Sequence, residues 1–203
     1  IGGKKELEGP LHAYFDELSR DTRFRQRTWE KAESKMQALA LETAKSKAGI
    51  RDEDIDVLLS GDLLNQCVSS SFAVRDTDIP FLGLYGACST MAEALLLAGV
   101  AVNSGYAQVA AAMSSSHFAT AERQYRFPLG YGGQRTPTAQ WTVTGAGCLI
   151  LGQREQGPFV NAATVGDTEA VGIDDYYGVR VGQVDAVFDY GRGDEHILFA
   201  AVE

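Results

Sequence analysis

Short apolar runs alternate with helical segments between residues 56 and 113, and this alternation constrains the fold more than any other feature of the sequence. The apolar runs cover residues 56–61, 80–85 and 108–113, and they are typical of buried strands. Residues 63–74 and 89–103 lie between them and are predicted to be helices, the second of which is almost wholly apolar and therefore buried. Strands and helices alternating at this spacing predict βαβ units, a parallel sheet and an α/β fold.

The segments on either side of this region are less regular. A long helix is predicted between Thr28, which suits an N-cap, and Gly49, which suits the residue after a helix end. The preceding residues 1–27 are predicted to form an irregular arm with a short amphipathic piece around residues 11–18. The pattern lapses over residues 114–140, and a loop of that length in a compact domain is usually functional or disordered; its aromatic residues favour order. Residues 141–151 and 159–165 are predicted to be two further strands that form a hairpin.

Composition and charge exclude several classes of protein. Hydrophobic residues make up 45% of the chain and charged residues 22%, as in ordinary globular proteins. The net charge of −9 argues against a nucleic-acid partner, and acidic residues are concentrated in residues 167–203. The longest apolar run, residues 94–102, is too short to cross a membrane, and no signal peptide is visible. No transmembrane segment is therefore predicted.

The three cysteines indicate a possible nucleophile and no metal site. No pair has metal-ligand spacing, so neither a metal, a cofactor nor a disulfide framework is predicted, and Cys67 and Cys148 are expected in the core. Cys88 lies in the segment Gly-Ala-Cys-Ser-Thr at residues 86–90, where a predicted strand meets the buried helix. Free amide groups of the first turn and the helix dipole would stabilise a thiolate there. A small structural cysteine explains the local sequence equally well.

Other candidate residues follow the predicted strands. Asp62 and Asn65 come after the first strand, at the edge where open α/β sheets bind ligands, although an N-cap and a loop amide explain them equally well. His117 comes after the third strand and is either a site residue or a capped structural histidine. Arg123 and Arg126 offer guanidinium groups that match a carboxylate, or they belong to a surface ion-pair cluster.

Five motifs, in order along the chain, resemble those of the stage V sporulation protein AD family of endospore-forming bacteria. They occupy residues 54–66, 86–90, 115–124, 131–134 and 142–145. The resemblance covers residues 9–177, and the sequence departs from the family pattern after Gly178. It implies a thiolase-like layered sheet with buried helices, related to β-ketoacyl-ACP synthase III. Residues 1–178 would form the N-terminal half of that fold, and residues 179–203 a divergent acidic segment.

The resemblance also implies a function and a set of site residues. It implies that the chain binds dipicolinic acid, free or as its calcium chelate, and supports uptake of this acid into the developing spore without full catalytic machinery. Cys88 would occupy the nucleophile position of the thiolase fold, and His117 with residues 131–133 the loop over the pocket. The predicted ligand site contains Asp62, Asn65, Cys88, His117, Arg123, Tyr131, Gly132 and Gly133.

Partners and an alternative activity follow from the same resemblance. It implies a homodimer formed through the strand predicted at residues 108–113, and contacts with membrane proteins of the stage V sporulation A operon. The location would be cytoplasmic or peripheral on the forespore inner membrane. The alternative function is an acyltransferase of the ketoacyl synthase type, with Cys88 as the acyl-accepting nucleophile. The chain lacks the histidine that such enzymes take from their second half, and this favours a binding protein over an enzyme.

Overall fold

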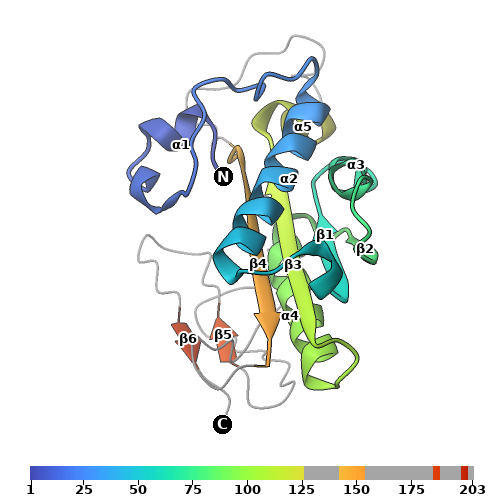
Figure 1. Cartoon of the computed structure of the whole chain (residues 1–203). Helices are drawn as coiled ribbons and strands as arrows, with labels where there is room; N and C mark the ends of the chain where they lie inside the picture. Colours follow the sequence, from blue (N-terminus) through green and yellow to red (C-terminus); the bar gives the residue numbers. More distant parts are fainter. Residues whose placement is uncertain (126–141, 154–184, 188–197, 201–203) are drawn as a thin grey trace.

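The computed structural model describes residues 1–125, 142–153, 185–187 and 198–200 (Figure 1). Strands and helices alternate from β1 to β3, and this confirms the predicted α/β class. The strand predicted at residues 159–165 and the boundary predicted at Gly178 lie outside the described residues. The elements, with η for a 3-10 helix, are α1 (Lys4–Glu8), η1 (His12–Tyr14), α2 (Trp29–Ala48), η2 (Asp52–Asp54), β1 (Val57–Gly61), α3 (Val68–Val74), β2 (Phe81–Leu84), η3 (Ala87–Ser89), α4 (Thr90–Asn103), β3 (Val109–Ser116), α5 (Phe118–Tyr125), β4 (Gly145–Gly152), β5 (Asp185–Val187) and β6 (Leu198–Ala200).

The main sheet has four strands in the order β2-β1-β3-β4, and β5 and β6 form a separate antiparallel pair. β1 runs parallel to both β2 and β3, as predicted, whereas β4 runs antiparallel to β3. The parallel pairing predicted for the first three strands is therefore confirmed, and β4 adds an antiparallel strand to them. Ser116 at the end of β3 pairs with Gly145 at the start of β4, so the chain re-enters the sheet at the edge it has just left.

The position of β3 also corrects the strand predicted to form a dimer. β3 corresponds to the strand predicted at residues 108–113 and lies between β1 and β4. Its backbone groups are paired on both sides, and a strand without a free edge cannot pair with a second chain. In the described part of the sheet, β2 is an edge strand that has β1 as its neighbour on one side.

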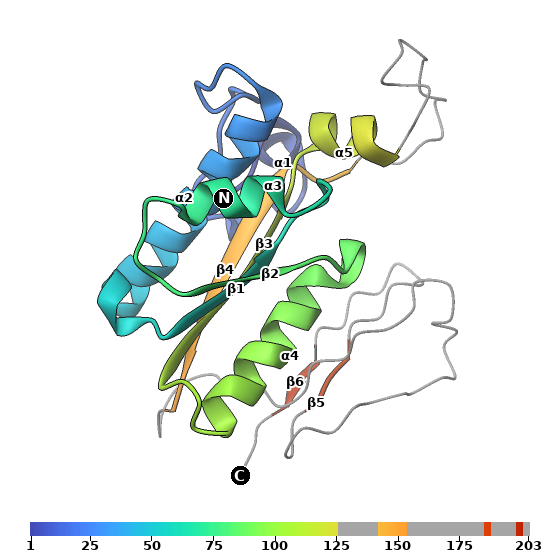
Figure 2. The same cartoon turned by 90° about the vertical axis from the view of Figure 1, so that its right-hand side faces the viewer.

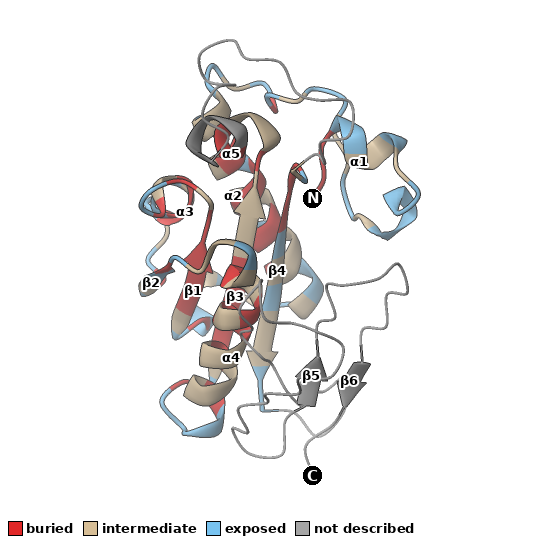
Figure 3. Cartoon of the chain, turned by 180° about the vertical axis from the view of Figure 1, so that it is seen from behind, coloured by how far each residue is buried: buried red, intermediate tan, exposed pale blue. Residues whose placement is uncertain are grey.

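Helices cover both faces of the sheet (Figure 2). Successive residues of a strand point to opposite faces, so Leu59 of β1 packs with Leu95 of α4, and Leu58 packs with Leu41 of α2. Figure 3 shows the resulting band of buried residues along β1 and β3. α4 is fully buried only on the side that faces the sheet, and its Leu96 and Leu97 are partly buried, so the prediction of burial all round is wrong for the described structure.

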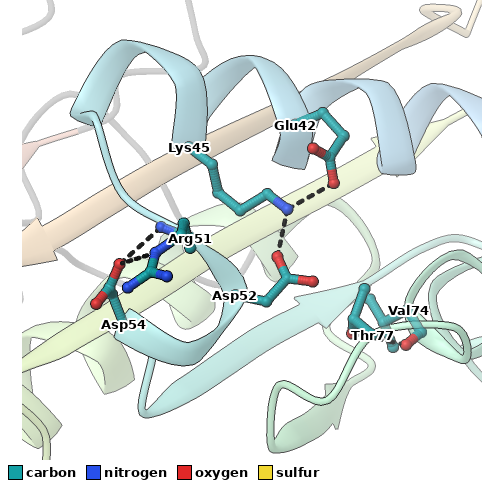
Figure 4. Close-up of polar contacts among 7 residues, drawn as sticks. All are labelled: Glu42, Lys45, Arg51, Asp52, Asp54, Val74 and Thr77. Carbon is teal, nitrogen blue, oxygen red and sulfur yellow. Dashed lines mark hydrogen bonds and ion pairs between the residues drawn. The ribbon is translucent and has the colours of Figure 1, made fainter.

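The predicted ends of the long helix are confirmed. The Thr28 side chain accepts a hydrogen bond from the Lys31 amide at 3.2 Å, which caps the start of α2. Gly49 ends α2 in the left-handed conformation, with φ of 68°, that glycine adopts without steric cost. Lys45 lies in the last turn and binds Glu42 at 2.6 Å and Asp52 of η2 (Figure 4). The contact with Asp52 joins the end of α2 to the turn that leads into β1.

Three predicted segments differ from the structure. The piece expected around residues 11–18 contains only η1, and α3 begins at Val68 rather than five residues earlier. The lapse predicted over residues 114–140 is wrong for its first part, because β3 continues to Ser116 and α5 follows. Serine hydroxyls near the end of β3 find partners inside the protein, so the polar run stays in the sheet: Ser116 donates to the Val143 carbonyl at 2.5 Å.

Among the described residues, no helix combines the length and apolar character needed to span a bilayer.

Candidate functional site

Three predicted site segments meet at one edge of the sheet. β1, β2 and β3 are parallel, so their carboxyl ends lie at the same edge (Figure 2). Asp62 directly follows β1, the turn with Cys88 follows β2, and His117 directly follows β3. The three segments therefore lie at one edge, and ligands of open α/β sheets bind at such an edge.

Cys88 lies in a tight turn between β2 and α4, as predicted. It occupies the middle of η3, two residues before α4 begins, and it is exposed. The turn is held by the Ser89 hydroxyl, which donates to the Gly86 carbonyl at 2.7 Å, and by the Thr90 hydroxyl, which donates to the Ala87 carbonyl at 2.9 Å. The thiol is therefore available to a ligand or an electrophile. We call residues 86–90 the Cys88 turn.

A buried carboxylate oxygen lies against the Cys88 turn. Oε2 of Glu93, in the first turn of α4, is buried and has no hydrogen-bond partner among the described residues. A Cβ atom added to Gly86 would lie 2.5 Å from this oxygen, so a side chain at residue 86 would displace the carboxylate. A negative charge here opposes a second anion at the turn. Glu93 was not predicted as a site residue; the signal in the sequence is a lone acid in an otherwise apolar helix.

Asp62 acts as a local cap rather than as a free carboxylate. Its side chain is buried and accepts hydrogen bonds from the Leu64 amide at 2.8 Å and from the Ser70 amide and hydroxyl at 2.7 and 2.6 Å. These bonds hold the turn after β1 and the first turn of α3. Asn65 is exposed on the same turn. Of the two explanations that the sequence left open for Asp62, the geometry favours the structural one.

His117 is enclosed at the turn between β3 and α5. It is fully buried, its Nε2 donates to the Thr22 carbonyl at 2.7 Å, and its Nδ1 accepts from the Ala119 amide at 3.1 Å. This pattern requires a neutral ring with the proton on Nε2. The ring also packs against Trp29 of α2 and Phe118, with centroids 5.3 Å apart in both cases. Because both nitrogens bind backbone groups, this geometry is that of a structural histidine.

Comparison with known proteins identifies the family. The model of the family described as stage V sporulation protein AD (SpoVAD) matches residues 1–189. The chain belongs to the stage V sporulation protein AD family. It is 41% identical over 187 residues to stage V sporulation protein AD of Bacillus subtilis (strain 168), an alignment that covers 92% of this chain and 55% of that protein. The chain thus spans about half the length of this curated relative.

Two solved structures are also similar to this member of the family. One is 3-oxoacyl-[acyl-carrier-protein] synthase III from Aquifex aeolicus VF5, with 16% identity, a TM-score of 0.44, and coverage of 64% of this chain and 41% of that one. The other is the priming β-ketosynthase of the R1128 polyketide biosynthetic pathway, with 19% identity, a TM-score of 0.45, and coverage of 63% and 37%.

The other two cysteines of this stage V sporulation protein AD family member are core residues. Cys67 is buried and its thiol donates to the Leu84 carbonyl at 2.9 Å, and burial raises the pKa of this thiol. Cys148 of β4 is half-buried between two hydrophobic clusters, and burial raises its pKa to about 12. Both thiols are therefore poor nucleophiles at neutral pH, in agreement with their predicted role.

A buried polar network behind the sheet edge was missed by the sequence analysis. Glu33 and Gln37 lie one turn apart on α2 and are fully buried. The Gln37 amide donates to Ser70 at 2.9 Å and to Ser115 at 2.6 Å, and accepts from Ser60 at 3.3 Å. The network thus joins α2 to β1, α3 and β3. The sequence signal was two polar residues on the apolar face of a helix, opposite short runs of serine.

The remaining predicted site residues are not placed relative to the Cys88 turn. Arg123 lies in α5, and Arg126, Tyr131, Gly132 and Gly133 lie outside the described residues. Two open clefts of the described part lie away from this turn. One, of about 270 Å³, is lined by residues that include Tyr14, Lys47 and Cys148, and the other, of about 560 Å³, lies between residues 17–25 and α2.

Proposed function

We propose that this chain binds dipicolinic acid at the carboxyl edge of its sheet and supports uptake of the acid into the developing spore. The observation that carries the proposal is membership of a sporulation protein family, together with an exposed, glycine-containing turn at the edge where α/β sheets bind ligands. Asp62 and His117 shape the site by holding neighbouring turns, because their polar atoms bind groups of the protein itself.

The charge at the Cys88 turn favours the calcium chelate over the free dianion. Dipicolinate carries two negative charges at neutral pH, and the Glu93 carboxylate beside the turn opposes them. A calcium ion bound by dipicolinate cancels its charge and accepts further oxygen ligands. The unpartnered Oε2 of Glu93 is an oxygen of the kind that calcium prefers.

Calorimetry tests this proposal directly. The chain is titrated with dipicolinate, with calcium, and with both in equal amounts. We expect the tightest binding with the mixture, a loss of that advantage in Glu93→Gln, and only modest weakening in Cys88→Ala. Glu42→Gln, which alters an exposed carboxylate on α2, is the matched control and should bind as the unaltered chain does. The absence of heat at millimolar ligand in every titration would refute the proposal.

A second function, acyl transfer through Cys88, is favoured by the exposure of this thiol on its turn. In such a reaction the thiolate attacks an acyl thioester, forms an acyl-cysteine and releases the free thiol. Intact mass after incubation with acetyl-CoA tests the step, with Cys88→Ala as the control. If iodoacetamide modifies Cys88 but no acyl adduct appears, the acyl-transfer function is wrong.

Homodimerisation and peripheral association with membrane proteins of the stage V sporulation A operon are further parts of the proposal. In the described part of the sheet β2 is an edge strand and carries the half-exposed Leu82, so antiparallel pairing of β2 with a second copy would extend the sheet. Sedimentation tests the dimer: Leu82→Lys should convert it to a monomer. A chain that is already monomeric at micromolar concentration would contradict this part.

A further inference from the structure

The Thr120 hydroxyl, in the first turn of α5, faces two acceptors but has a single proton to give. Its Oγ1 lies 2.7 Å from Oε2 of Glu33 and 2.9 Å from the carbonyl oxygen of His117. A hydroxyl donates one hydrogen bond at a time. The protonation state of Glu33 therefore decides which of the two oxygens accepts the hydrogen bond from Thr120.

Each state of Glu33 has its own consistent set of hydrogen bonds. As a carboxylate, Glu33 accepts from Thr120 through Oε2 and from Ser115 through Oε1, at 2.7 and 2.9 Å. With a proton on Oε2, Glu33 instead donates to Thr120, and Thr120 can then donate to the His117 carbonyl. That carbonyl is also the first acceptor of α5, taking a bond from the Ala121 amide at 2.9 Å. The bond to Ser115 is the same in both states.

We propose that Glu33 and Thr120 form a proton-linked pair whose hydrogen bond reverses direction when Glu33 gains or loses a proton, and that this pair positions the first turn of α5 at the sheet edge. Glu33 is thus a positioning residue that acts through Thr120. Its effect on the ligand rests on the function proposed above, whereas the reversal of the hydrogen bond does not.

The surroundings of Glu33 bring its titration close to neutral pH. The side chain is fully buried and forms no ion pair with a described residue, so loss of solvent raises its pKa to about 7. The charge of Asp62, from the turn after β1, also raises the pKa, while the hydroxyls of Thr120, Ser115 and Ser69 lower it. His117, which packs against Trp29 one turn before Glu33, is a further titratable group at this edge, and the Arg23 guanidinium lies 4.3 Å from the centroid of the Trp29 ring.

Trp29 reports on this turn without any ligand. Its ring lies 5.3 Å from His117 and 6.2 Å from Phe118, measured between centroids. In the full chain carrying Trp141→Phe, Trp29 is the remaining tryptophan, so its fluorescence is followed between pH 5 and pH 9. We expect one transition centred near pH 7. Glu33→Gln should abolish it and hold the spectrum of the acid form, because the amide donates to Thr120 as the protonated acid does.

Two further variants distinguish the pair from a general effect of pH. Thr120→Val removes the hydroxyl, so the transition should move to higher pH, since the carboxylate loses a hydrogen bond. Glu42→Gln, on the same helix, should titrate as the unaltered chain does. A transition that persists in Glu33→Gln would assign it to His117 and overturn the proposal, as would a Glu33→Gln variant, folded by circular dichroism, that holds the alkaline spectrum.

Ligand binding provides a separate readout. The dissociation constant of the calcium and dipicolinate mixture should change across the same pH range in the unaltered chain and lose that change in Glu33→Gln. If no variant binds the mixture at any pH, the proposed function fails and the fluorescence result still decides the hydrogen-bond pair. If the chain binds with a pH dependence that survives in Glu33→Gln, Glu33 does not position the site.

Discussion

The Cys88 turn and the buried network around Glu33 and Gln37 lie at the same edge of one sheet. Their polar groups differ in whether they have hydrogen-bond partners inside the protein. Each oxygen of Glu33 accepts a hydroxyl hydrogen bond inside the protein, whereas Oε2 of Glu93 has no described partner. The Cys88 thiol is exposed, whereas Cys67 donates to a backbone carbonyl. Groups with internal partners hold the fold together, whereas a buried polar atom without a partner is uncommon and marks the Cys88 turn as the candidate ligand site.

Gly61 is the last residue of β1 and lies close to both regions. Its replacement should have the largest effect on the free energy of unfolding. A Cβ atom at residue 61 would overlap the Leu84 carbonyl oxygen and lie 2.6 Å from the Thr90 side chain. We expect Gly61→Ala to lower the free energy of unfolding by more than about 3 kcal/mol, measured by urea denaturation. Gly99→Ala is the control, since an added Cβ meets nothing within 4 Å there and should stabilise α4 by up to about 1 kcal/mol. Equal effects at both glycines would contradict the packing described here.

Stability should fall as pH rises through the range in which Glu33 loses its proton. The pKa of Glu33 is about 7 in the folded chain and 4.5 as the reference for an exposed glutamate, so the folded state binds more protons between these values. Glu33 therefore contributes most to the free energy of unfolding at low pH. This contribution, about 3 kcal/mol, is lost by about pH 7. Denaturation at a series of pH values measures the slope. A Glu33→Gln variant with the same slope would show that another group is responsible.

Replacement of the buried Cys67 should lower the free energy of unfolding more than replacement of the exposed Cys88. Cys67→Ala removes a buried hydrogen bond and buried sulfur, so we expect a loss of about 1–2 kcal/mol in the free energy of unfolding. Cys88→Ala should change it by less than about 0.5 kcal/mol because the thiol is exposed. Thermal denaturation of the two variants side by side is sufficient. A costly Cys88→Ala would mean that this thiol has a structural role.

The smallest effect concerns reactivity rather than stability. Brief treatment with iodoacetamide at neutral pH should modify Cys88 first, because Cys67 is buried and the pKa of Cys148 is about 12. Peptide mapping by mass spectrometry identifies the alkylated residue, and unfolding in urea should make the three cysteines react alike. Early labelling of Cys67 in the folded chain would contradict the prediction that the buried thiol reacts more slowly than the exposed Cys88.

The local elements were predictable because their signals are contained in neighbouring residues. The cap at Thr28, the stop at Gly49 and the turn at residues 86–90 depend on side-chain chemistry and on the freedom of glycine, and each was found where the sequence predicts it. The direction of β4 and the length of β3 were not predictable. Both depend on pairing between strands that a segment of about 30 residues separates in the chain, and local sequence does not contain that pairing.

The sequence by itself determined the α/β class, the family and the place of Cys88 at the end of a strand. Only the tertiary structure decided which polar residues are free. His117 and Asp62 are candidates for a site in the sequence, but in the fold their atoms bind backbone groups from distant or neighbouring turns. Neither Glu33 nor Glu93 was predicted as a functional residue. In the fold, Glu33 is fully buried, and Oε2 of Glu93 has no hydrogen-bond partner among the described residues. Hydrogen-bond partners come from several elements at once, so their presence or absence is a property of the packed chain.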